Sequence, residues 1–162
     1  MNNSHVRGFT LIELLIVIAI IGVLAGLGGV AASKAVLMAK KAKARTTVQT
    51  LTVALDRYKN DVGIYPPDDS PATVMNHLTG FKESPDQLSN DFDPDWHGPY
   101  YNATKKEFYM RQRNMALIDP WMKPYQFSLK KPKNNVTGCD VWSWGPNGID
   151  DGGSGDDIGN WQ

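Results

Sequence analysis

The feature that most constrains this chain is a long apolar run near its N-terminus that carries one carboxylate. No charged residue occurs from Leu14 to Ala32, and Glu13 stands at the start of this run. A helix rises about 1.5 Å per residue, so roughly 20 such residues cross the apolar core of a bilayer. A charge in that setting costs on the order of 3 kcal/mol on insertion-based scales. The run therefore predicts a membrane helix, and the retained charge indicates that Glu13 has a function.

The residues around the start of the run form a processing motif. Residues 1–8 are too few to hold the apolar core of an ordinary signal peptide, so any segment that is removed is the polar leader ahead of Phe9. The segment Gly8-Phe9-Thr10-Leu11-Ile12-Glu13, followed by an apolar helix, resembles the N-terminus of type IV pilins and type II secretion pseudopilins.

This resemblance implies three roles. A prepilin peptidase would cut after Gly8, and Phe9 would then be N-methylated. Glu13 would pair with the cationic amine of a neighbouring subunit in an assembled fibre, because an opposite charge offsets the cost of burying a charge. The alternative is a plain single-pass anchor that contains Glu13 by chance.

The helix is predicted to continue beyond the apolar run. Gly63, followed by Ile64-Tyr65-Pro66-Pro67, predicts a C-cap and an end, so one helix runs from about Phe9 to Val62. Its first half would lie in lipid and its second half would pack on a small domain. The packing face is one apolar stripe at spacings of three and four residues, formed by Ala44, Val48, Leu51, Leu55, Tyr58 and Val62.

The remainder of the chain predicts a small antiparallel sheet. Six prolines make residues 66–100 rich in loops, with a short helix over Ala72–Leu78. Strand-like stretches follow at residues 107–112, 125–129 and 140–144, and the turn-rich segment between the last two predicts a hairpin. A sheet packed on the amphipathic half of the helix buries the apolar faces of both.

This half of the chain resembles a narrower family, the major pseudopilins of type II secretion. Met122 departs from that family, which usually has Gly there, and Asn147 stands where Asp is common. Residues 68–95 and 101–116 look longer than usual, which indicates a divergent branch. The single cysteine, Cys139, excludes the intramolecular disulfide that many type IV pilins carry. The resemblance rests on Tyr58-Lys59-Asn60-Asp61, Gly63-Ile64-Tyr65-Pro66, Gly98-Pro99-Tyr100, Asp119-Pro120-Trp121-Met122-Lys123-Pro124-Tyr125, Ser143-Trp144-Gly145-Pro146-Asn147-Gly148 and Asp157-Ile158-Gly159-Asn160-Trp161.

An acidic, glycine-rich segment near the C-terminus predicts a metal site. Four carboxylates and three glycines fall within residues 150–157. Calcium binds about six to eight oxygens in flexible geometry, and glycines let backbone carbonyls turn inward. Composition alone leaves a solvated, disordered tail as the alternative, but Ile158 and Trp161 are apolar anchors that such a tail does not need. The resemblance implies calcium in this loop, with candidate side-chain ligands Asn147, Asp150, Asp151, Asp156 and Asp157.

The predicted fold class is α+β. A long N-terminal helix, with a membrane-spanning first half, packs on a small antiparallel β-sheet domain with a C-terminal metal-binding loop. Residues 1–8 form a cleaved leader, residues 9–33 the transmembrane and assembly helix, and residues 34–162 the periplasmic globular domain. The family topology puts that domain outside the inner membrane, although a basic cluster after the run conflicts with the positive-inside rule. We interpret this cluster as a solvated helix face; it contains Lys34, Lys40, Lys41, Lys43 and Arg45.

The predicted function is structural, because the sequence offers no catalytic set. Seventeen basic and seventeen acidic residues give zero net charge, so no global bias indicates nucleic acid as a partner. The resemblance implies a homopolymer, joined by minor pseudopilins, that forms a periplasmic pseudopilus and drives protein export across the outer membrane. Its other implied partners are the prepilin peptidase, an assembly ATPase, an inner-membrane platform protein and the inner membrane itself. The alternative is a type IV or competence pilin for adhesion or DNA uptake.

Overall fold

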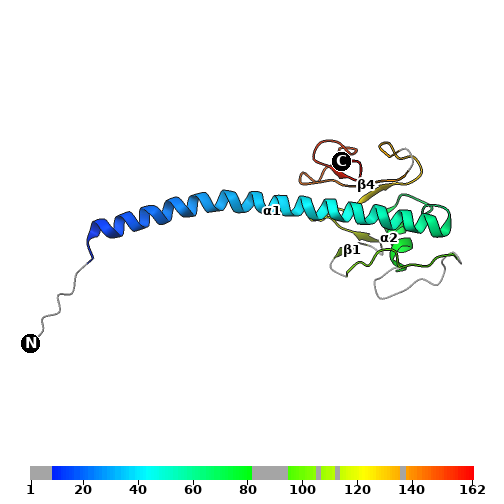
Figure 1. Cartoon of the computed structure of the whole chain (residues 1–162), viewed down its shortest axis with the longest axis horizontal. Coiled ribbons are helices and arrows are strands. Elements are labelled where there is room, and N and C mark those ends of the chain that lie inside the picture. The colour runs from blue at the N-terminus through cyan, green and yellow to red at the C-terminus, as the bar shows by residue number, and fades with distance from the viewer. Residues whose placement is uncertain (1–8, 82–94, 105–106, 112–113, 136–137) are drawn as a thin grey trace, which may run out of the picture. The chain divides into compact units, whose positions relative to one another are not determined.

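A computed structural model of the chain describes residues 9–81, 95–104, 107–111, 114–135 and 138–162. The chain divides into two compact units, residues 1–38 and residues 39–162. Helix α1 (Leu11–Val62) contributes to both units, and all the remaining helices and strands belong to the second (Figure 1). The helix predicted from about Phe9 to Val62 is therefore confirmed, and it begins two residues later than expected.

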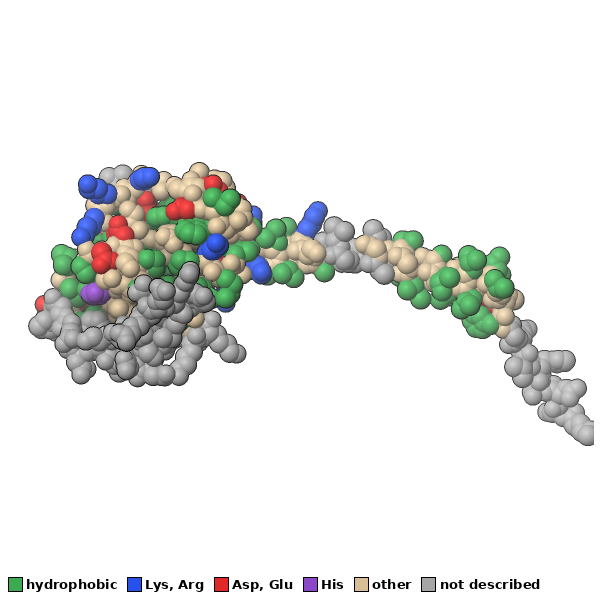
Figure 2. Space-filling view, turned by 180° about the vertical axis from the view of Figure 1, so that it is seen from behind, with side chains coloured by type: hydrophobic (Ala, Val, Ile, Leu, Met, Phe, Trp, Pro, Cys, Tyr) green, Lys and Arg blue, Asp and Glu red, His purple; other side chains and the backbone are tan. Residues whose placement is uncertain are grey.

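The described part of the first unit is a helical segment whose large apolar side chains are exposed. The large hydrophobic side chains from Leu11 to Leu24 are exposed, and Figure 2 shows them on the face in view. The structure does not confirm the predicted membrane span over residues 9–33: within the described residues, no helix is both long and apolar enough to cross a membrane. That stretch includes residue 25 and residues 27–31, whose side chains the structure does not describe.

The C-terminal half of α1 buries the predicted apolar stripe. Ala44, Val48, Leu51 and Leu55 are fully buried, Tyr58 is nearly so, and Val62 is partly buried against the same cluster. The helix ends where glycine permits a left-handed backbone. Gly63 has φ of +87° and its amide donates to the carbonyl of Lys59 at 2.8 Å, as the C-cap prediction requires.

A second helix and a two-stranded sheet pack on one side of α1. Helix α2 (Pro71–Thr79) begins with a proline, which fits the first turn because its missing N–H has no helical partner there. It buries Val74, Met75 and Leu78 and confirms the predicted short helix. Strands β1 (Phe108–Arg111) and β2 (Asn114–Leu117) pair antiparallel. The sequence analysis predicted β1 but not β2.

A three-stranded sheet lies on the other side of α1 (Figure 1). It contains β3 (Gln126–Ser128), β4 (Asp140–Ser143) and β5 (Ile158–Gly159), all antiparallel in the order β3-β4-β5. The pairing of β3 with β4 confirms the predicted hairpin. The expectation of a single small sheet was wrong, because the described strands form two sheets that sandwich the helix stripe.

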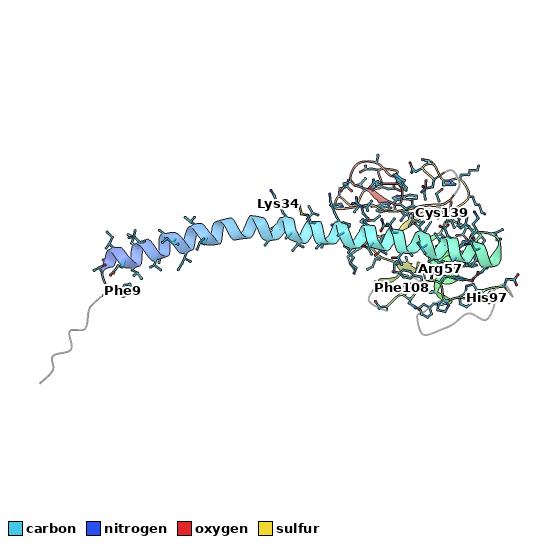
Figure 3. The ribbon with its side chains drawn as sticks, in the orientation of Figure 1. Phe9, Lys34, Arg57, His97, Phe108 and Cys139 are labelled. Carbon is cyan, nitrogen blue, oxygen red and sulfur yellow. The ribbon has the colours of Figure 1, made fainter. Side chains whose placement is uncertain are left out.

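The core of the second unit forms where the helix stripe meets both sheets and α2. Tyr125, Phe127 and Val141 from the three-stranded sheet region are buried against it, and Phe108 and Leu117 come from the other sheet. Figure 3 shows Phe108 and Cys139 on opposite sides of α1. The predicted packing of an antiparallel sheet on the amphipathic half of the helix is therefore confirmed.

The segment after β5 ties the three-stranded sheet to the helix. The side-chain amide of Asn160 donates to the Thr52 hydroxyl of α1 at 3.1 Å and to the carbonyl of Cys139 at 2.9 Å. Its side-chain oxygen accepts from the amide of Val141 and from the side chain of Asn135. One half-buried side-chain amide thus joins α1, the segment 135–141 and the residues after β5.

Candidate assembly and metal sites

The predicted processing site lies at the edge of the described chain. Gly8 lies outside the described residues. Phe9 is exposed and lies two residues before the first residue of α1 (Figure 3), and Glu13 lies in the first turn of α1. Two of the three predicted processing and assembly residues therefore lie at or just before the start of α1.

Glu13 is held by a reciprocal N-terminal cap that the sequence analysis missed. The amide and the hydroxyl of Thr10 donate to Oε2 of Glu13 at 2.9 and 2.7 Å, and the amide of Glu13 donates to Oγ1 of Thr10 at 3.3 Å. These bonds satisfy backbone N–H groups that the first helical turn leaves unpaired. The signal was in the sequence, since Thr-x-x-Glu ahead of an apolar run is the capping-box pattern.

The acidic segment folds into a loop that is stabilised by hydrogen bonds between its own residues. Asn147 joins three parts of it: its side-chain amide donates to Oδ2 of Asp151 at 3.1 Å, its backbone amide to Oδ2 of Asp156 at 2.9 Å, and its Oδ1 accepts from the amide of Ile149 at 2.7 Å. Asn147, Asp151 and Asp156 were all predicted as ligands. The structure brings them together, and the alternative of a disordered tail is not supported.

Asp157 is the most buried carboxylate of this loop. Its Oδ2 accepts from the amides of Asp151 and Gly153 at 3.1 and 2.8 Å, whereas its Oδ1 is buried and has no hydrogen-bond partner. Burial raises the pKa of Asp157, and the nearby carboxylates of Asp150 and Asp151 raise it further. A buried oxygen without a donor is the state in which a cation is most favourable.

Asp150 is turned toward a different partner. Its Oδ1 accepts from the indole N–H of Trp142 at 3.2 Å and from the amide of Gly152 at 3.0 Å. The loop also needs glycine at a close approach: Gly155 has φ of +59°, and an added Cβ would lie 2.5 Å from Oδ2 of Asp151. The turns that carry the carboxylates therefore depend on glycine, as the composition indicated.

The entrance of the loop is fixed by a buried carboxylate that the sequence analysis did not assign to the site. Oδ2 of Asp119 accepts from the Ser143 hydroxyl at 2.6 Å, and the Ser143 oxygen accepts from the amide of Gly145 at 3.1 Å. Oδ1 of Asp119 accepts from the amides of Trp121 and Lys123, closing a tight turn. This carboxylate has no sequence signature apart from its place in the Asp-Pro-Trp segment.

The turn closed by Asp119 requires a left-handed backbone conformation at Met122. Met122 has φ of +67°, a left-handed conformation that costs a residue with a Cβ roughly 1–2 kcal/mol. Glycine adopts it without that cost. The glycine that the resemblance led us to expect at this position therefore has a backbone reason, and the turn forms here with Met122 in its place.

The structure does not by itself show the predicted metal site. Among the side chains that the structure describes, no three His, Cys, Asp or Glu residues are grouped closely enough to hold a metal ion by themselves. Calcium also takes amide and backbone carbonyl oxygens. All the predicted ligands of this loop carry oxygen donors, which is the ligand type that calcium prefers.

Comparison with known proteins gives matches over nearly the whole chain. Residues 32–161 match the family model described as "Type II secretion system (T2SS), protein G", and residues 3–29 match the model "Prokaryotic N-terminal methylation motif". The type II secretion system core protein G of Pseudomonas aeruginosa is 30% identical over 100% of this chain and 99% of that protein. The protein of the same name from Klebsiella pneumoniae is 32% identical over 96% of this chain and 94% of that protein.

Among solved structures, the chain resembles the crystal structure of the major pseudopilin from the type 2 secretion system of enterohaemorrhagic Escherichia coli. That match has a TM-score of 0.48 and 24% identity, and it covers 79% of this chain and 87% of the other. The family assignment rests on the sequence matches. The chain belongs to the type II secretion system protein G family, and it carries the N-terminal methylation motif of that class of filament proteins.

Proposed function

We propose that this chain is a structural subunit of a type II secretion pseudopilus. The observation that carries the proposal is the joint match of one chain to the methylation motif over residues 3–29 and to the protein G family over residues 32–161. The chain then acts by polymerising and not as an enzyme. A type IV or competence pilin is not favoured, because the matched family and the named relatives belong to secretion.

The N-terminal residues carry the processing and assembly steps of this function. Prepilin peptidase cuts after Gly8, Phe9 receives a methyl group on its new amine, and the processed chain is stored in the inner membrane through residues 9–33. In the fibre, the Glu13 carboxylate faces the cationic amine of a neighbouring Phe9. The cap described above supports this role, because Thr10, the residue after Phe9, holds the carboxylate at the N-terminal end of the helix.

The C-terminal loop binds calcium in this proposal. Asp157 contributes the buried Oδ1, and Asp151, Asp156 and Asn147 contribute further oxygens, with Asp150 at the edge of the set because Trp142 already binds it. Calcium supplies positive charge that offsets the repulsion among these carboxylates. The loop residues themselves position the oxygens, and Asp119 fixes the strand end from which the loop departs.

The partners follow from the filament role. The chain polymerises with copies of itself and with minor pseudopilins in the periplasm. The prepilin peptidase processes it, and an inner-membrane platform protein with a cytoplasmic ATPase drives its assembly. The fibre moves proteins toward the outer membrane, so the globular domain lies in the periplasm.

Mass spectrometry and fibre assembly test the proposal together. The mature chain is expected to begin at Phe9 with one added methyl group, and a bulky substitution of Gly8 blocks cleavage while Gly8→Ala only slows it. Glu13→Leu keeps the chain in the membrane fraction but abolishes fibres and secretion. An intact Met1 in assembled fibres, or normal secretion by the Glu13→Leu chain, would contradict the proposed function.

A further inference from the structure

The basic residues at the start of the second unit form a charged surface to which the filament role gives no task. Lys40, Lys41, Lys43 and Arg45 fall within two turns of α1, and all four side chains are exposed. Ala44 among them is fully buried, so the packed core begins at this level and leaves the charges outside it. We name Lys40, Lys41, Lys43 and Arg45 the basic segment.

No carboxylate of α1 offsets these charges. The helix contains no Asp or Glu from Leu14 to Leu55, so the ion pairs three and four residues apart that neutralise many charged helix faces cannot form there. Among the residues that the structure describes, none of the four basic side chains forms an ion pair. The positive charge of the basic segment is therefore free to meet a partner outside the chain.

The place of the basic segment along the helix indicates a membrane surface as that partner. The apolar run ends at Ala32, and Lys40 follows it by eight positions, or about 12 Å of helix. Between them, Val36, Leu37 and Met38 are apolar and yet 57, 40 and 69% exposed. Exposed apolar side chains followed directly by cations are typical of a helix at the boundary between the acyl chains and the headgroups of a bilayer.

The lengths involved match the range of attraction to such a boundary. A headgroup layer is about 6 Å thick, and a charge at its outer edge acts over about 8 Å at physiological ionic strength. Counted from Ala32, Lys40 and Lys41 fall inside this combined range, and the remainder of the basic segment begins within one helical turn of its limit. Lysine side chains are also long and flexible, so their ammonium groups can extend toward the headgroups.

We propose that Lys40 and Lys41, together with the rest of the basic segment, bind the headgroups of anionic phospholipids while the subunit is stored in the membrane. This contact explains why cations that are unfavourable outside the cytoplasm are retained after the apolar run. The contact has to break when the subunit leaves the bilayer for the fibre, so it holds unassembled subunits in the membrane. The inference rests on the proposed function and names a partner of its membrane-stored form.

Lipid retention by the full-length chain tests the contact. The chain in neutral detergent micelles is mixed in turn with phosphatidylglycerol, phosphatidylcholine and inorganic phosphate, and the phosphorus that stays with the affinity-purified chain is counted. We expect about tenfold more phosphatidylglycerol than phosphatidylcholine, equivalent to about 1.4 kcal/mol, and no retained inorganic phosphate. The double variant Lys40→Gln, Lys41→Gln is expected to bring the ratio of the two lipids to about one, whereas Lys40→Arg, Lys41→Arg keeps the charges and the ratio.

The matched control is a second adjacent pair of exposed lysines in the same unit, changed to Lys130→Gln, Lys131→Gln. A preference for phosphatidylglycerol that the change at Lys40 and Lys41 removes and the control keeps supports the contact. An unchanged ratio, an equal fall in the control, or equal retention of inorganic phosphate overturns it.

Fibre formation in cells separates the contact from the function. Loss of fibres by the Lys40→Gln, Lys41→Gln chain with full lipid retention would assign the basic segment to contacts between subunits and overturn the lipid contact. A wild-type chain that forms no fibres overturns the filament role, and the lipid ratio of the purified chain is measured independently of that result. Each idea can therefore fail alone.

Discussion

Two buried carboxylates of the three-stranded sheet region differ in how completely their oxygens are hydrogen-bonded. Asp140 at the start of β4 and Asp157 just before β5 are each 2% exposed. Both oxygens of Asp140 are satisfied, by five N–H donors from Lys133, Asn134 and Asn135. Asp157 receives two donors on one oxygen and leaves the other without a partner. The comparison teaches that two equally buried carboxylates can differ in whether an oxygen is left to accept a further ligand.

The largest expected effect is at the fully bonded carboxylate. Asp140→Ala leaves five donors without their acceptor, and we expect the free energy of unfolding to fall by about 3 kcal/mol, with or without calcium. Urea unfolding of the chain lacking residues 1–33, in chelator and in excess calcium, measures it. Asn134→Ala is the control, because it removes only the long 3.3 Å side-chain bond and is expected to change stability little. If calcium restored the free energy of unfolding of the Asp140→Ala chain, the distinction between Asp140 and Asp157 would be lost.

Calcium is expected to stabilise the folded state by binding the Asp157 carboxylate. At about a hundredfold excess over its dissociation constant, calcium stabilises the folded state by roughly 2.7 kcal/mol by mass action. Chelator should therefore lower the melting temperature, calcium should restore it, and magnesium should do so less well because it demands stricter octahedral geometry. Asp157→Ala abolishes the response and exposes the C-terminus to protease. A melting temperature indifferent to chelator would argue that the loop holds no calcium.

Asp157 also predicts that the stability of the folded state depends on pH in calcium-free buffer. Burial raises the pKa of Asp157 in the folded state, so protonation favours folding. The stability that protonation supplies is fully present below the ordinary carboxyl pKa of about 4 and is lost as the pH rises through the higher folded value. Asp157→Asn removes this charge, so we expect it to raise the melting temperature by roughly 3 °C at neutral pH.

The comparison of pH profiles isolates this one group. The difference in melting temperature between Asp157→Asn and the wild type should shrink as the pH falls toward 4 (roughly, the ordinary carboxyl pKa). Carboxylates outside the loop titrate equally in both chains and cancel, and Asp150 and Asp151 contribute only through their interaction with the Asp157 charge. A difference that stays constant with pH would show that the Asp157 charge is not the cause.

The smallest expected effect tests whether the turn ahead of the loop is strained. Met122 is 66% exposed, so Met122→Gly removes no core contact. The relief of the left-handed backbone exceeds the entropy that glycine loses on folding by about 0.5 kcal/mol, and thermal unfolding should show this small gain. Met122→Ala keeps the Cβ and is expected to give no gain. A stabilised Met122→Ala would point to a cause other than backbone strain.

The sequence predicted those parts of the molecule that repeat or that carry a strong local signal. The apolar stripe from Ala44 to Val62 predicted the packed half of α1, and Gly63 predicted where the helix ends. The hairpin of β3 and β4 followed from alternation and turn composition. Strand β5 has only two residues, and a segment that short has no periodicity to detect.

The candidate sites divide in the same way. Asn147, Asp150, Asp151, Asp156 and Asp157 were predicted as a group from composition and from the family resemblance, and the structure brings them into one loop. Which carboxylate is left open could not be predicted, because hydrogen bonds to backbone amides are set by the tertiary path of the chain. Asp119 contacts the start of the loop through Ser143, at the end of β4. No local sequence pattern connects these two residues, because they are 24 positions apart.

The amide of Asn160 has a consequence for the order of events in biosynthesis. It bonds Thr52 across 108 positions of the sequence, and β5 just before it completes the sheet. The apolar stripe of α1 therefore leaves the ribosome long before the segment that locks its cover in place. A closure that depends on such distant partners is slow to form. Until that closure forms, the apolar stripe lacks part of its cover and is exposed to chaperones and proteases.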